Sequence, residues 1–383
     1  MKKEDRGLLG FSIGHFVLDG YAAILIPLYP FIAQRLEINI VTISFVIAIG
    51  HSISSILQPV FGYISDNIST RFFMFWGLIL ASVFMPLGYI APNAGILTLC
   101  LVLGMLGNAF YHPQVTKMIK DFYKENQKLS FAIGLFLGLG TIGYALSPYL
   151  STFIVQKFGN DKFIYVSLVG ILISFFMLFF APKIPKIKEK TSLYFTEAIK
   201  DISSNKICML LILITIVKAT LVMAYGTYIP FLLKKFDFPI IHIGFIVTMF
   251  YISGGLSMIA APKFEKYLKL KGMIALSYLP LLPLTVLFLW LLNLNKIAAI
   301  CTLIVIGFFV LLAAGVVLAH AQKTTTKYVG IISGIIQGLT LAIGSLLLIP
   351  LGYIGQAFGV EWILITITLI AFILSFYTLK QQI

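Results

Sequence analysis

The sequence predicts an all-α integral membrane protein with twelve transmembrane helices, arranged as two pseudo-symmetric six-helix bundles. Its composition is 60% hydrophobic and only 11% charged, whereas soluble domains carry about 25% charged residues. The apolar runs have the length of membrane-crossing helices and lack the alternating pattern of a β-barrel. A repeat of about 200 residues relates the two halves, because Pro30-Phe31 recurs as Pro230-Phe231.

Twelve apolar runs justify the predicted helices in order. Each run is long enough to cross ~30 Å of hydrocarbon at ~1.5 Å per residue. Polar segments separate them. The predicted spans are 7–33, 41–65, 72–91, 95–118, 129–156, 162–181, 207–233, 240–262, 272–292, 297–320, 328–356 and 360–379.

One long polar stretch divides the chain. We predict an N-terminal bundle at 1–181, a cytoplasmic linker at 182–206 and a C-terminal bundle at 207–383. Leu193 and Ile202 belong to a set of apolar residues in the linker, and this set predicts a short amphipathic helix on the inner membrane surface. The linker is therefore expected to tether the two halves.

The distribution of basic residues indicates the orientation. With the N-terminus placed in the cytoplasm, the inner segments hold 21 Lys and Arg residues, the outer loops hold six, and Lys218 lies inside a span. Because cytoplasmic loops are enriched in Lys and Arg, we expect both termini to lie inside a bacterial cytoplasmic (inner) membrane. This pattern accounts for the net charge of +14 without a nucleic-acid partner.

Asp19 and Lys218 are ionisable residues near the middle of long apolar runs, 199 positions apart. A charge at bilayer depth costs roughly 2.5–3.5 kcal/mol on insertion scales, so such residues usually face a water-filled cavity or a partner inside a bundle. His15 precedes Asp19 by four residues and therefore shares its helix face. We assign these three residues to a central cavity.

A charged motif follows the second span. Gly62, Asp66 and Arg71 resemble the loop signature of the major facilitator superfamily, and Ala261 to Glu265 is a degraded second copy. Glycine permits close helix approach, and Asp66 can bind Arg71 and the positive end of a neighbouring helix. The resemblance implies an inner gate, and an ordinary solvated loop is the alternative.

Glycines in the fifth and eleventh spans suggest helix packing. Gly138, Gly143 and Pro148 loosely resemble the fifth-span motif of drug/proton exporters in that superfamily, and Gly334 and Gly338 recur in the second half. Small residues let helices approach closely, and proline bends a helix. Packing alone also explains these residues.

A broader resemblance is to the fosmidomycin resistance protein family, a bacterial branch of the superfamily. The similar segments are His15 to Tyr21, Pro27 to Pro30, Ser54 to Gly62, Gly107 to Pro113 and His320 to Gly344. The resemblance implies the major facilitator fold and proton-driven export of small toxic compounds. Asp19 is then expected to be a proton-coupling carboxylate and Lys218 its counter-charge, which could attract an anionic substrate once freed. A static pair that fixes helix packing is the alternative.

Other polar residues in the spans are candidates for substrate contact. They are Tyr21, His51, Gln58, Asn108, His112, Gln114, His320 and Gln322. Structural hydrogen bonding would also account for the histidines. No spacing matches a metal-ligand pattern, and Cys100, Cys208 and Cys301 form no disulfide framework or thiolate motif. We therefore predict no metal site and no cofactor.

The predicted function is that of a secondary active transporter and not of an enzyme. The sequence lacks a phosphate-binding loop and a nucleophile elbow. We expect proton-coupled efflux of drugs or small toxic metabolites by alternating access. The expected partners are a small-molecule substrate, protons and membrane lipids, and the protein is expected to be a monomer. Two alternatives remain open: import of a sugar or organic anion, and transport of metal ions or metal complexes.

Overall fold

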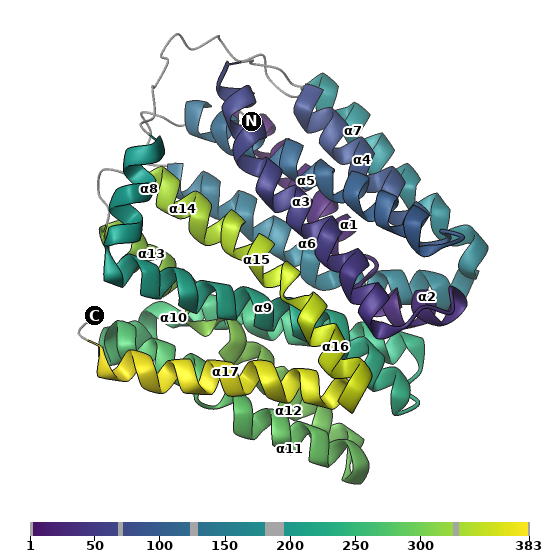
Figure 1. Ribbon diagram of the computed structural model, residues 1–383. Helices are drawn as coiled ribbons and strands as arrows, with labels where there is room; N and C mark the ends of the chain where they lie inside the picture. Colours follow the sequence, from purple (N-terminus) through teal and green to yellow (C-terminus); the bar gives the residue numbers. More distant parts are fainter. Residues whose placement is uncertain (1–2, 68–71, 123–128, 181–194, 325–328, 382–383) are drawn as a thin grey trace. The chain divides into compact units, whose positions relative to one another are not determined.

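Helices make up the structure, with no strand in the part of the chain that it describes (Figure 1). The computed structural model describes residues 3–67, 72–122, 129–180, 195–324 and 329–381. The chain divides into two compact units. The first is Met1–Ile38 with Ile49–Thr191, and the second is Asn39–Ala48 with Ser192–Ile383.

The first unit contains the helices of the first six predicted spans. Its elements are α1 (Lys3–Ala23), η1 (Ile26–Leu28), α2 (Tyr29–Arg35), most of α3 (Ile40–Asn67), α4 (Phe72–Tyr89), α5 (Ala94–Phe122), α6 (Leu129–Phe158), η2 (Asn160–Val166) and α7 (Ser167–Phe180). Helix α1 packs on α6, while α4 packs on both α5 and α7.

The second unit repeats this arrangement after α8. Its elements are α8 (Phe195–Ser204), α9 (Lys206–Lys235), α10 (Ile240–Tyr278), α11 (Leu281–Leu294), α12 (Lys296–Leu312), α13 (Ala314–Thr324), α14 (Val329–Gly334), the π-helix η4 (Ile335–Leu339), α15 (Thr340–Leu346), α16 (Leu348–Phe358) and α17 (Val360–Lys380). Helix α9 packs on α15 as α1 packs on α6, and α17 (yellow in Figure 1) contacts both α9 and α11.

The described helices account for the twelve predicted spans. Among the described residues, ten segments are long and apolar enough to cross a membrane. One of them, Ile240–Leu294, has 55 residues, or about 80 Å of helix, which is enough for two crossings. Its helix breaks at Lys269, where φ is 53° and ψ is −173°. The 30-residue α6 supplies the remaining span.

The internal repeat is visible in the backbone as well as in the sequence. Glu37 and Asp237 have φ angles of 53° and 57°, and Gly159 and Gly359 have φ angles of 86° and 103°. Each pair is separated by 200 positions. Matching hydrogen bonds close the first pair of turns, from Ile38 N to Ala33 O at 3.0 Å and from Phe238 N to Leu233 O at 3.1 Å. The two halves therefore share turn geometry as well as helix order.

Glycines allow the backbones of neighbouring helices to touch. A Cβ atom at Gly143 of α6 would overlap the Phe16 carbonyl of α1. In the second unit, a Cβ atom at Gly344 would lie 2.8 Å from the Ala219 Cβ atom of α9. Close approach through small residues is the usual way in which membrane helices pack. Gly138 and Gly334 differ, because an added Cβ there meets nothing within 4 Å.

One described helix lies within the predicted linker, and the role of the linker stays a prediction. Helix α8 covers Phe195–Ser204, with Ile202 buried and Ile199 exposed. Leu193 lies outside the described residues. Many large apolar side chains of both units are exposed, among them Leu172 and Ile259, as expected for surfaces that face lipid.

Candidate functional site

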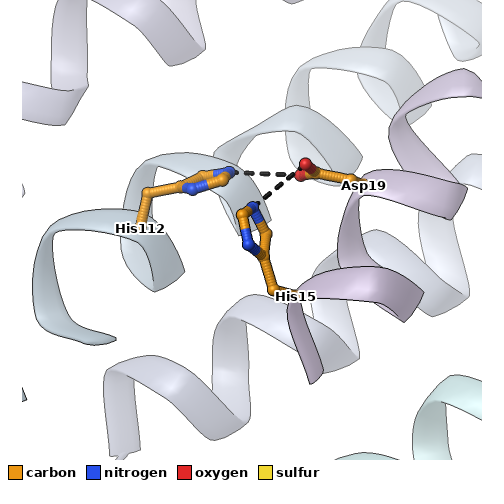
Figure 2. Close-up of side chains that lie close together, drawn as sticks. All are labelled: His15, Asp19 and His112. Carbon is orange, nitrogen blue, oxygen red and sulfur yellow. Dashed lines mark ion pairs between the residues drawn. The ribbon is translucent and has the colours of Figure 1, made fainter. Parts of the chain in front are cut away.

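Three side chains from two helices meet inside the first unit. His15 and Asp19 lie one turn apart on α1, and His112 comes from α5 (Figure 2). His15 Nε2 lies 3.0 Å from Asp19 Oδ2, and His112 Nε2 lies 3.3 Å from Asp19 Oδ1. Each carboxylate oxygen therefore faces one imidazole. We refer to these three residues as the His-Asp-His cluster.

The cluster lies deep in its span, and its three side chains differ in exposure. Asp19 is near the middle of the 29-residue apolar segment Gly7–Arg35. The exposed side-chain fractions rise from 2% at His15 to 18% at Asp19 and 28% at His112. His112 is therefore the most exposed member of the cluster.

The Phe136 carbonyl determines where one hydrogen of His15 lies. His15 Nδ1 is 2.7 Å from Phe136 O, and a carbonyl oxygen only accepts hydrogen bonds, so Nδ1 carries a hydrogen. Nε2 of a neutral ring would then present a lone pair to the Asp19 carboxylate, and two acceptors 3.0 Å apart repel. A proton on His15 Nε2 or on Asp19 Oδ2 would turn this contact into an attraction, as an imidazolium–carboxylate pair or as a neutral pair. Without it, Nε2 is buried with no hydrogen-bond partner among the described residues.

Helix α6 holds the His15 ring in place. Phe136 stacks on the ring, with centroids 4.0 Å apart, and His112 meets it edge-on at 4.7 Å. A Cβ atom at Gly140 would overlap the imidazole. Sequence reasoning connected neither α6 residue with the cluster. Phe136 contacts His15 through its backbone carbonyl, which a sequence pattern does not mark. Gly140 belongs to a glycine-rich run, and that run was the signal in the sequence for close contact between α6 and a neighbouring helix.

A hydrogen bond aligns α5 with α1. The buried Tyr111 hydroxyl donates to the Phe11 carbonyl at 2.7 Å. Tyr111 directly precedes His112, so this bond fixes the height at which His112 meets Asp19. Sequence reasoning did not connect these two helices.

The other predicted cavity residues of the first unit lie apart from the cluster contacts. The Tyr21 hydroxyl donates to Val166 O at 2.6 Å and accepts from Gly170 N at 3.0 Å, which joins α1 to α7. His51 of α3 is buried and Gln58 is partly exposed. Asn108 Oδ1 and Gln114 Oε1, both on α5, are buried without a hydrogen-bond partner among the described residues. Their contact with substrate remains a prediction.

In the second unit, Lys218 and His320 have different surroundings. Lys218 of α9 lines a small cavity with residues of α10, α12 and α13. His320 Nδ1 lies 2.9 Å from Val316 O and 3.7 Å from Glu265 Oε1. Glu265, the acidic residue in the second copy of the predicted gate motif, thus lies beside a histidine. Gln322 lies nearby on α13.

The remaining predicted residues concern the gate and packing. Gly62 and Asp66 fall within α3, but the surroundings of Gly62, the side chain of Asp66 and the whole of Arg71 lie outside what the structure describes. The gate therefore stays a prediction. Pro148 lies inside α6, and Ser147 beside it donates to Gly20 O of α1 at 2.5 Å. Gly338 is buried in η4.

The cluster also has donor atoms suited to a metal ion. One atom from each of the three residues lies within 4.8 Å of the others, and two imidazoles with one carboxylate suit several transition metals. However, the two rings face different carboxylate oxygens at hydrogen-bond distances of 3.0 and 3.3 Å. We interpret these contacts as two ion pairs and not as a metal centre.

Two bundles of membrane-length helices with an ionisable cluster at mid-depth define a membrane carrier. The major facilitator superfamily profile matches residues 11–348, and the chain belongs to that superfamily. It is therefore a transporter of small molecules and not an enzyme.

Two curated relatives and two solved structures are similar to this chain. The fosmidomycin resistance protein of Escherichia coli K12 is 24% identical, over 93% of this chain and 88% of that protein. The probable nitrate transporter NarT of Staphylococcus epidermidis is 27% identical, over 58% of this chain and 56% of that protein, so the match spans about half of each.

The nucleoside transporter NupG has a TM-score of 0.77 at 14% identity, covering 100% of this chain and 100% of its own. A bacterial homologue of Spinster has a TM-score of 0.76 at 14% identity, covering 99% of this chain and 97% of its own.

Proposed function

We propose that this transporter exports drugs or small toxic metabolites in exchange for protons, and that the His-Asp-His cluster binds the coupling proton. The observation that carries the proposal is the 3.0 Å approach of the buried His15 Nε2 to Asp19 Oδ2, while the bond from His15 Nδ1 to Phe136 O leaves Nε2 as the position that a coupling proton would occupy. Ionisable groups at membrane depth commonly form proton relays. The protein is expected in a bacterial cytoplasmic membrane with both termini inside.

The cluster would work by changing its net charge. With one shared proton, the imidazolium ion and the carboxylate cancel, or both groups are neutral. A second proton, entering through the more exposed His112, makes the cluster positive. A charge at this depth costs roughly 2.5–3.5 kcal/mol, which corresponds to a bias of about 100-fold between two conformations. Proton uptake and release can therefore drive the alternation between inward and outward access.

The direction of transport is proposed from similarity. The fosmidomycin resistance protein aligns with nearly the whole chain, which supports export. The NarT match favours a second candidate, transport of a small anion such as nitrate. The two candidates share the carrier mechanism and differ in substrate and direction.

Everted membrane vesicles provide a direct test. Respiration acidifies their lumen, and a pH-sensitive dye reports proton release when fosmidomycin or another compound is added. We expect release with the wild-type protein and none with Asp19→Asn. Glu361→Gln is the matched control, because this carboxylate belongs to the second unit and pairs with Lys235. Wild-type release in Asp19→Asn would remove Asp19 from the mechanism.

Right-side-out vesicles distinguish the second candidate, transport of a small anion, from drug export. Uptake of labelled nitrate into these vesicles, with no proton release caused by drugs in everted ones, would favour anion import. The opposite result supports export.

A further inference from the structure

An apolar groove of about 540 Å³ lies on the second unit, where α11 and α17 pack on each other. Its lining residues are Leu282, Pro283, Val286, Leu287 and Trp290 of α11 and Phe372 of α17. None of these side chains is charged, and the indole N–H of Trp290 is their one polar group. The groove therefore suits an apolar ligand.

The groove lies on the outward face of α11. Phe288 and Leu292 are buried and turn the opposite face of the helix toward the protein interior. In the groove, Val286 is 50% exposed and Trp290 is 59% exposed. Because α11 belongs to the membrane-length apolar segment Ile240–Leu294, this exposed stripe faces hydrocarbon and not water.

The length of the groove corresponds to one leaflet of a bilayer. Leu282 and Trp290 are eight positions apart, or ~12 Å of helix, and half of the hydrocarbon thickness is ~15 Å. Trp290 lies one turn before α11 ends at Leu294, and Asn295 and Lys296 beyond it are exposed. Tryptophan is enriched where hydrocarbon meets the headgroups. The groove therefore runs from the headgroup level toward the middle of the bilayer.

The size of the groove favours a lipid chain over a second protein. Stable protein interfaces use about 20–30 residues from each partner, whereas six residues line this groove. Between apolar groups inside a membrane, van der Waals packing decides which contacts form. A groove surrounds a flexible chain with more atoms than a flat helix face does, and each atom pair adds attraction.

We propose that this groove binds one acyl chain of a membrane phospholipid, with the headgroup of that lipid beside Asn295 and Lys296. The Lys296 Nζ atom donates a hydrogen bond to Phe236 O at 2.7 Å. An ammonium group has three hydrogens, so the other two can meet a phosphate oxygen. This lipid site is independent of the substrate that the protein carries and of the direction of transport.

Tryptophan quenching in the purified full-length protein tests the lipid site. The probe is phosphatidylglycerol with brominated acyl chains, titrated into the detergent solution, because bromine quenches indole fluorescence on contact. The double variant Trp76→Phe/Trp362→Phe leaves Trp290 in the groove as the one tryptophan of the chain. We expect its half-maximal quenching at a lipid concentration at least about threefold below that for a tryptophan outside the groove.

Trp76 provides that matched reference. The double variant Trp290→Phe/Trp362→Phe leaves only Trp76. This residue is 50% exposed, compared with 59% for Trp290, and it lies one turn from the first residue of α4. Exposure and distance from a helix end are therefore similar for the two tryptophans, and the groove is the difference between them.

A larger side chain in the groove should displace the lipid. Val286→Phe, added to the variant that keeps Trp290, should raise the half-quenching lipid concentration at least about threefold. Ile259→Phe is the control, because Ile259 of α10 is 76% exposed but does not line the groove, and it should change that concentration less than about twofold. Both positions are exposed, so neither substitution fills the protein interior.

Equal half-quenching concentrations for Trp290 and Trp76 would overturn the inference, as would unchanged quenching in Val286→Phe. Light scattering on the same samples tests a second copy of the chain as the occupant. A dimer that Val286→Phe dissociates would assign the groove to a second copy and overturn the lipid site. A monomer in every sample, together with the expected differences in quenching, supports it.

Discussion

Gly140 of α6 lies so close to His15 of α1 that one added methyl group would overlap the imidazole ring. Gly140→Ala should therefore displace His15 from Phe136 O and disturb the shared proton. We expect proton-coupled transport to fall at least about tenfold, and the free energy of unfolding to fall by about 1–3 kcal/mol from overpacking. Proteoliposome transport and thermal unfolding measure the two effects.

Gly138 provides the matched control two residues away. Its added Cβ meets nothing within 4 Å, so Gly138→Ala should keep wild-type transport and gain about 0.5–1 kcal/mol from helix propensity. Equal loss of transport in both variants would show that the contact with His15 is not the cause.

His112→Gln separates hydrogen bonding from proton transfer. Glutamine retains an N–H donor for Asp19 Oδ1, which now lies 3.3 Å from His112 Nε2, but it does not titrate. We expect a folded protein whose transport rate depends less on external pH than the wild-type rate does, because one of the two imidazoles that can accept a proton is gone. Initial rates measured at several external pH values check this. A profile that matches the wild type would exclude His112 as the proton entry group.

Tyr21→Phe tests a structural role against a cavity role. The hydroxyl bonds Val166 O and Gly170 N across to α7, so its loss should cost about 1–3 kcal/mol of stability. The substrate concentration at half-maximal rate should stay within twofold, as measured in the same vesicles. A large rise in that concentration with unchanged stability would place Tyr21 in contact with substrate.

Gly344→Ala should destabilise the second unit. Its added Cβ would lie 2.8 Å from Ala219 Cβ and 2.9 Å from Thr220 N, which costs about 1–3 kcal/mol. Gly334→Ala has open space around it and should be neutral. Thermal unfolding in detergent compares the two variants, and equal melting temperatures would contradict the packing described above.

A metal-binding test addresses the remaining alternative. If the cluster holds two ion pairs and no metal, Zn²⁺ or Ni²⁺ should stabilise the wild type and His15→Ala to the same extent in thermal-shift assays. Stabilisation that disappears in His15→Ala would instead support a metal ion as ligand or cargo.

The helices could be predicted because hydropathy over about 20 residues is a strong signal. The spans 95–118 and 207–233 match α5 and α9 closely, with ends that differ by a few residues. Hydropathy does not indicate where a helix breaks within a span. The separation of α12 from α13 at Ala313 carries no proline or glycine at the break, and it had no sequence signal.

The site could be predicted only where its residues share one helix. His15 and Asp19 are four apart, so their contact follows from helix geometry. His112 is on another helix, and its position depends on the hydrogen bond from Tyr111 to Phe11. Tyr21 follows Asp19 by two residues and therefore points roughly 200° around the helix, which is why it reaches α7 and not the cluster.

The turns at Glu37 and Asp237, and at Gly159 and Gly359, have kept the same unusual backbone at equal spacing, whereas the chemistry inside the two halves has diverged. The first half carries an acid beside two histidines, whereas the equivalent helix of the second half carries Lys218. The repeat therefore keeps the same corners in both halves while the ionisable side chains that those corners position differ in sign, so equal backbones do not imply equal chemistry at equivalent sites.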